Sequence, residues 1–177
     1  MRSGQSFRVN EWHRERYGDP CRECGFDWSI SVHSALALAD AIPARCAATL
    51  DGHSGAERAP DLGWCAAEYL CHIVDNFRIW AERLAAAGLG AQVVLVPYDA
   101  DALADARVYP NVPLEGSLWS LRSAERDWRD AVRLAESSGA VLVHPERGEQ
   151  SVEEVVRGNV HDAVHHHWDI ARSIATT

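Results

Sequence analysis

The sequence predicts an all-α protein that folds as a four-helix bundle with one long crossover. Four segments carry apolar residues at helical spacing, and a long connection separates the second segment from the third. The chain of 177 residues has the length of one domain, and no internal repeat divides it. Four amphipathic helices with one long connection are typical of such bundles. The four segments are residues 31–50, 64–88, 116–137 and 151–175.

The first two segments differ in how clearly they predict a helix. The first contains Pro43, which has no amide hydrogen and is expected to kink or divide the helix. The second has a regular apolar stripe, and Gly88 is a natural stop. The stripe consists of Leu70, Ile73, Phe77, Trp80 and Leu84.

The last two helices have candidate caps at their starts. Ser117 could cap the third helix. Ser151 and Glu154 have the spacing of a capping box for the fourth helix. The connection before the third helix predicts a short helical turn over residues 99–107. Residues 91–96 could instead form a strand, which would make the fold α+β, and residues 139–148 contain a strand-like piece.

The composition excludes some classes of partner. The formal net charge of −9 argues against a nucleic-acid surface, which needs a basic patch. The sequence has no apolar run of about 18 residues, so no membrane span is expected. It also begins without a hydrophobic signal segment, so the expected location is cytoplasmic. All 17 basic residues are arginine, which suggests a GC-rich genome such as that of an actinobacterium.

Four histidines lie close together near the C-terminus. His161 and His165 are four residues apart, so on a helix their imidazoles share one face. Such a pair can offer two nitrogens to a first-row metal. His166 and His167 point about 100° and 200° further round and are expected to be surface or supporting residues. A third ligand must come from another helix, where His72 is the candidate; buried histidines without a metal are the alternative.

The residues around these histidines resemble motifs of the DinB-like superfamily. "GWCAAEYLCHIVDN" resembles the W-S-x-x-E-x-x-x-H-x-x-D opening of its second helix, and "HDAVHHHWDI" resembles its closing H-x-x-x-H motif. The resemblance covers residues 30–175. It implies a four-helix bundle over residues 29–177, preceded by an N-terminal extension over residues 1–28. It also implies that a divalent metal, zinc or nickel, is bound by His72, His161 and His165.

The resemblance also implies a reaction. Characterised enzymes of this superfamily include mycothiol-dependent maleylpyruvate isomerase and bacillithiol S-transferases. We therefore expect a metal-dependent thiol S-transferase or thiol-dependent isomerase that uses a low-molecular-weight thiol against a small electrophile. A divalent cation lowers the pKa of a thiol, and mycothiol is the natural co-substrate of an actinobacterial protein. The alternatives are a non-catalytic metal- or small-ligand-binding accessory or stress protein, and a hydrolase using metal-bound hydroxide. Such bundles often pair, so a homodimer is a further prediction.

Three charged residues are candidates for catalysis. Glu68 shares a helix face with His72 and could act as a base, although an acid in a first helical turn also suits the helix dipole. Asp75 could hold an imidazole N–H or serve as the base of a hydrolase. Arg157 could bind a substrate carboxylate, or it could be an ordinary solvated side chain.

The cysteines do not indicate a disulfide framework, because five is an odd number and no export signal is present. Cys21 and Cys24 form a C-x-x-C pair followed by glycine, which resembles half of a zinc knuckle. A closed zinc site needs four ligands, and His13, His33 and Cys46 are candidates to complete it. A redox pair and two unremarkable thiols are the alternatives.

Overall fold

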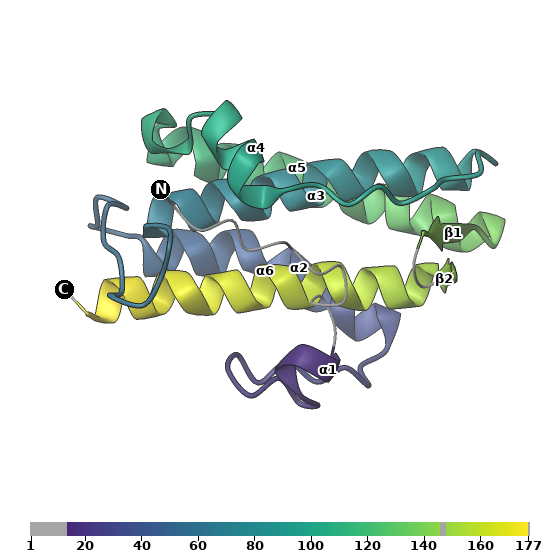
Figure 1. The fold of residues 1–177 in the computed structure, drawn as a ribbon, viewed down its shortest axis with the longest axis horizontal. Helices are drawn as coiled ribbons and strands as arrows, with labels where there is room; N and C mark the ends of the chain where they lie inside the picture. Colours follow the sequence, from purple (N-terminus) through teal and green to yellow (C-terminus); the bar gives the residue numbers. More distant parts are fainter. Residues whose placement is uncertain (1–13, 146–147, 177) are drawn as a thin grey trace.

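A computed structural model describes residues 14–145 and 148–176 and confirms the predicted four-helix bundle. Helix α3 packs along α5 and α6, and α2 packs along α6 and α5, so the four long helices enclose one core (Figure 1). A short α1 (Arg14–Tyr17) precedes them, and α4 (Ala100–Ala106) and the 3-10 helix η1 (Tyr109–Asn111) lie in the crossover. The long helices are α2 (Val32–Thr49), α3 (Ala66–Gly88), α5 (Leu114–Ser138) and α6 (Val152–Ala175).

The helix starts confirm one predicted cap and correct another. The Ser151 hydroxyl accepts the Glu154 amide at 3.2 Å, and the Glu154 carboxylate accepts the Ser151 amide at 2.8 Å, which is the predicted capping box. Helix α5 instead begins after Pro113. Ser117 therefore lies inside the helix, where its hydroxyl is 3.3 Å from the Cys71 sulfur. The predicted Ser117 cap is wrong because proline at the cap position starts the helix one turn earlier.

Proline 43 does not divide the first long helix. Helix α2 runs through it without a break to Thr49, and Pro43 is itself buried. A proline inside a helix removes one backbone hydrogen bond, and the packing of this buried face offsets that loss. The expected division is therefore wrong, although the predicted ends of the helix are within one or two residues of those observed.

A small hairpin precedes α6. Strand β1 (Val141–His144) pairs antiparallel with β2 (Gly148–Ser151), and Val141 lies opposite Ser151. The predicted strand-like piece is therefore confirmed. In the crossover, Val94 makes one isolated parallel bridge to Val143, so the alternative strand at residues 91–96 is reduced to that bridge and the fold stays all-α. None of the helices that the structure describes is both long and apolar enough to cross a membrane.

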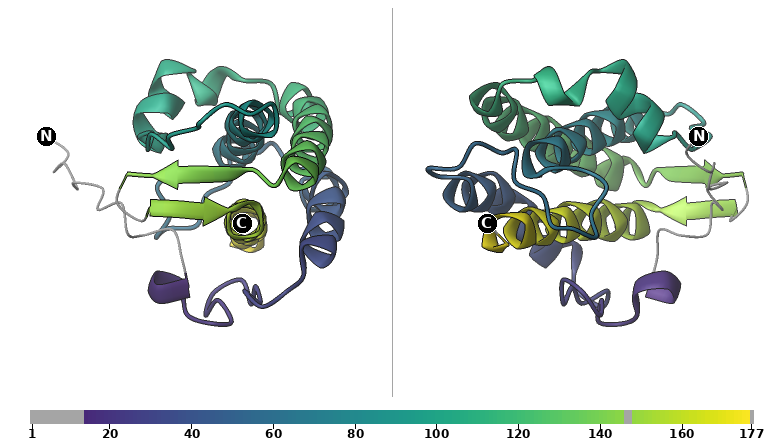
Figure 2. Two further views of the ribbon diagram at one scale, coloured as in Figure 1. Left: turned by 90° about the vertical axis from the view of Figure 1, so that its right-hand side faces the viewer. Right: turned by 60° about the vertical axis from the view of Figure 1, so that its left-hand side comes forward.

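The segment before α2 belongs to the same core as the bundle. Cys21, Phe26 and Trp28 are almost fully buried and join the core that contains Phe77 and Trp128. Burying a phenylalanine side chain such as that of Phe26 contributes about 1.5–3 kcal/mol relative to leaving it exposed. In the end-on view, α1 and the loop after it lie against the outside of α6 (Figure 2, left). This packing brings the C-x-x-C loop beside the histidine-rich turn of α6.

Candidate metal centre

A cavity of about 210 Å³ lies between α1, α3 and α6, with one wall from the start of α4. His72, His161, His165 and His166 line it. Arg16 and Tyr17 reach it from α1. The remaining lining residues are Trp64, Ala100, Asp101, Gly158 and Asp162. Ligand pockets commonly have volumes of about 300–1,000 Å³, so this cavity is smaller than most and limits the size of the molecule that it can enclose.

Two imidazoles and one carboxylate converge in this cavity. One nitrogen of His72, one of His166 and a carboxylate oxygen of Asp162 lie within 4.8 Å of one another. The Nε2 atom of His72 is 3.5 Å from Asp162 Oδ2, and Nε2 of His166 is 3.5 Å from Asp162 Oδ1. Ligands of a tetrahedral zinc ion at its usual bond lengths are about 3.4 Å apart, so these separations fit a bound metal.

The surroundings orient these three side chains. Asn76 donates from Nδ2 to Asp162 Oδ2 at 2.8 Å. Asp169 lies 3.0 Å from Nδ1 of His166, and a carboxylate can only accept, so this nitrogen donates and Nε2 is directed at Asp162. A carboxylate behind a histidine is the usual arrangement around a metal ligand. The buried Nδ1 atom of His72 has no hydrogen-bond partner in the part of the chain that the structure describes.

The charges of the group balance one another. Burial would raise the pKa of Asp162, but the neighbouring His166 and His72 outweigh it and hold that pKa far below its ordinary value. Burial likewise opposes protonation of His166, but Asp162 and Asp169 raise its pKa from 6.5 to about 9. Without metal, a proton on His166 therefore compensates the carboxylate. A divalent cation at the same place would supply that positive charge instead.

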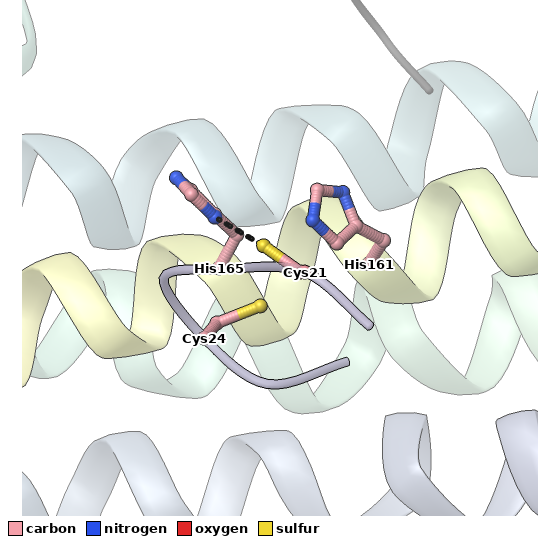
Figure 3. A group of neighbouring side chains, drawn as sticks. All are labelled: Cys21, Cys24, His161 and His165. Atoms are coloured by element: carbon pink, nitrogen blue, oxygen red, sulfur yellow. Dashed lines mark hydrogen bonds between the residues drawn. The ribbon is translucent and has the colours of Figure 1, made fainter. Parts of the chain in front are cut away.

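The other two histidines belong to a second group. Ligand atoms of His161, His165, Cys21 and Cys24 all lie within 4.8 Å of one another (Figure 3). Cys21 Sγ is 3.8 Å from Nδ1 of His165. The predicted set of His72, His161 and His165 is therefore not the set that converges. The reason is the rotation of about 100° between successive residues of α6, which turns His161 and His165 toward the C-x-x-C loop.

The three catalytic candidates lie outside the cavity lining. Glu68 accepts the Cys65 amide at 2.8 Å and closes the capping box of α3, so it has the alternative, local role. Asp75 is buried against Arg107 and Tyr109 of the crossover. Arg157 donates to the Ile30 carbonyl at 2.8 Å and pairs with a glutamate on its own helix. Each of these residues is therefore bonded to the scaffold and does not line the cavity.

Neither His33 nor Cys46 completes a metal site with Cys21 and Cys24. His33 is exposed, and Cys46 is buried in α2, and neither belongs to the group around Cys21. His13 lies outside the described residues.

Sequence reasoning missed Asp162 and His166 as a pair, and Arg16 and Tyr17 as cavity residues. Asp162 and His166 also have i, i+4 spacing, so the sequence offered two interleaved pairs on one helix. That spacing was the available signal, but it does not say which pair faces α3. No pattern in the sequence places α1 beside the cavity.

The fold and the two groups define a four-helix bundle with candidate metal-binding sites. No protein-family profile matches the chain, and no curated protein matches its sequence. Among solved structures, YfiT from Bacillus subtilis matches with a TM-score of 0.70 and 18% sequence identity, over 84% of this chain and 89% of that chain. YfiT is described as a probable metal-dependent hydrolase with an unusual four-helix bundle topology. The chain therefore shares the four-helix bundle fold of YfiT, which is the fold class that the sequence predicted.

Proposed function

We propose that this chain is a thiol S-transferase or thiol-dependent isomerase that uses a divalent metal held by His72, Asp162 and His166. The observation that carries the proposal is the convergence of two imidazoles and a carboxylate on one cavity. Three protein ligands leave a coordination position for an external molecule, and imidazole-rich donor sets suit zinc and nickel. When bound, such a cation lowers the pKa of a thiol and so makes a thiolate available near neutral pH.

The side chains of the cavity have separate tasks in this proposal. Asn76 and Asp169 hold Asp162 and His166 in place through the hydrogen bonds described above. Tyr17 and Trp64 supply apolar walls that exclude water from the reacting atoms. The Arg16 guanidinium could bind a carboxylate of the electrophile, the role for which Arg157 was a candidate from the sequence. Mycothiol is the proposed thiol, on the resemblance of the motifs.

A hydrolase is the second candidate. Two observations favour it: YfiT is described as a probable metal-dependent hydrolase, and the cavity of about 210 Å³ is small for a bulky thiol. Water is the nucleophile in this case, and three protein ligands with one remaining position are typical of hydrolytic zinc sites.

Paired assays on the zinc- and nickel-loaded protein separate the two candidates. Transfer of mycothiol, bacillithiol and glutathione to monobromobimane is measured above the spontaneous rate, and hydrolysis is measured on p-nitrophenyl acetate. We expect thiol transfer, reduced at least about 100-fold in His166→Gln and His72→Gln. The matched control is His167→Gln, because His167 is on the same helix but binds Thr49, and it should retain the rate.

The other outcomes of these assays contradict the transferase in different ways. Ester hydrolysis without thiol transfer would replace it by the hydrolase. Metal binding with neither reaction would identify a non-catalytic binding protein. A rate unaffected by His166→Gln would show that the converging group of His72, Asp162 and His166 is not the reacting centre.

A further inference from the structure

The loop after α1 holds two cysteines against the turn of α6 that carries His161 and His165. Their order along the chain, C-x-x-C followed far downstream by H-x-x-x-H, has the ligand spacing of closed Cys₂His₂ zinc sites. Figure 3 shows both sulfur atoms on the side of the loop that faces the two imidazoles. We propose that Cys21, Cys24, His161 and His165 bind a structural zinc ion, in addition to the metal at His72, Asp162 and His166.

The backbone of the loop is already bent around the two sulfur atoms. The Gly25 amide donates to the Cys21 carbonyl at 2.9 Å, and the Cys21 amide donates to the Phe26 carbonyl at 2.8 Å. Gly25 has a φ of 73°, which side chains with a Cβ rarely adopt, so glycine suits the turn directly after the second cysteine. Both cysteines are free thiols.

The distances between the ligand atoms fit one tetrahedral ion. Zinc–sulfur and zinc–nitrogen bonds of the usual lengths place tetrahedral ligands about 3.4–3.8 Å apart. The Cys21 sulfur and Nδ1 of His165 are 3.8 Å apart, and none of the four atoms is more than 4.8 Å from another. Closing the site therefore requires side-chain movements of about 1 Å and no rearrangement of α6 or of the loop.

The neighbours of the group support a ligand role. Nε2 of His165 lies 3.4 Å from the Glu23 carboxylate, which leaves Nδ1 directed at Cys21 and resembles the carboxylate behind a zinc-bound histidine. The rings of Tyr17 and Trp28 lie against the His161 ring, with centroid distances of 4.8 and 4.4 Å. Four protein ligands in an aromatic setting leave no position for substrate, which is the property of a structural site.

Charge makes the two neighbouring sites compatible. Two thiolates cancel the charge of a divalent cation, whereas Asp162 cancels only part of the charge at the other site. An ion held by Cys21 and Cys24 therefore repels the second ion little. Its effect on the fold is to tie the segment that carries Arg16 and Tyr17 to α6, and this segment forms one wall of the cavity.

The first test uses the wild-type chain, so it does not depend on the folding of a variant. Titration with the thiol reagent p-hydroxymercuribenzenesulfonate should release one zinc ion per chain as two thiols react. Replacing zinc with cobalt should give a thiolate-to-cobalt charge-transfer absorption and the intense visible bands of a tetrahedral ion. Neither measurement depends on turnover, so each can succeed or fail independently of the proposed enzyme activity. A zinc content that does not fall by one ion per chain after all thiols have reacted would overturn the proposal, because the other proposed site, at His72, Asp162 and His166, contains no thiol.

Variants assign the ion to the four residues. Cys24→Ser and His161→Gln should each lose one ion per chain and the charge-transfer band. Cys65→Ser and His167→Gln are matched controls, because Cys65 caps α3 and His167 contacts Thr49, and both should keep the ion and the band. Loss of the band in the controls but not in Cys24→Ser, or isolation of a Cys21–Cys24 disulfide from metal-replete cells, would overturn the site and favour a redox pair.

Discussion

The hydrogen bond from Tyr109 to Asp75 anchors the crossover to α3, and its removal has a predictable cost. Tyr109 is 1% exposed and Asp75 is 2% exposed, and the Tyr109 hydroxyl donates to Asp75 Oδ2 at 2.7 Å. A hydrogen bond to a charged group contributes about 1.5–3 kcal/mol. Arg107 also donates to this carboxylate, at 2.5 Å, and this bond should remain in Tyr109→Phe, so we expect the lower part of that range. For a chain of this size the unfolding temperature should fall by about 3–8 °C.

Thermal unfolding followed by circular dichroism, with and without Asp75→Asn, measures this bond. In the Asp75→Asn background the tyrosine donates to a neutral group, so Tyr109→Phe should cost only about 0.5–1.5 kcal/mol. Metal content should be unchanged in both variants, because neither residue lines the cavity. An equal cost in the two backgrounds would refute the argument that the carboxylate charge strengthens the bond. Loss of metal in Asp75→Asn would restore Asp75 as a residue of the site.

Two further predictions concern stability alone. Burial raises the pKa of Glu125 above its ordinary value of 4.5, despite nearby Arg129. The ionised carboxylate therefore destabilises the fold at pH values above the raised pKa, and this destabilisation disappears below pH 4.5. Glu125→Gln should therefore increase the free energy of unfolding at neutral pH by up to about 1 kcal/mol, seen as a higher unfolding temperature. This gain should vanish below pH 4.5. A gain that is the same at both pH values would contradict burial of the charge as the cause. Gly88→Ala should destabilise the protein by about 1–3 kcal/mol, because the new Cβ would lie 2.7 Å from the Leu134 side chain. Gly158→Ala lies inside α6, where the new Cβ meets open space, and should stabilise the protein by about 0.5–1 kcal/mol. Denaturant titrations measure both changes, and the same sign for both would contradict the packing described.

The fold could be predicted because its signals are local. Apolar spacing and the Ser151–Glu154 capping box mark α3 and α6, and both helices were placed within a few residues. The errors arose where packing decides. Pro43 stays within α2 because the buried face of the helix continues past it, and Ser117 lies inside α5 because Pro113 precedes it.

The site could be predicted only as far as residue types and helices. His72 and the histidine-rich turn of α6 do line one cavity. Spacing alone could not say that Asp162 and His166 face α3, because His161 and His165 have the same spacing one residue earlier. The partners of Cys21 and Cys24 lie far away in the sequence; Cys21 and His165, for example, are 144 residues apart. Only the folded chain brings them together.

The interleaving of the His161/His165 pair with the Asp162/His166 pair on α6 couples the two proposed sites to each other. Residues 161 and 165 serve one neighbour and residues 162 and 166 serve another, and the pairs differ by one residue step of about 100° around the helix. A single-residue insertion between the helix start and residue 161 would turn His161 and His165 toward α3, and a single-residue deletion would turn Asp162 and His166 toward the cysteines, so either change should disrupt both proposed sites. Substitutions can alter either proposed site separately, whereas a change in the length of this stretch of α6 must alter both.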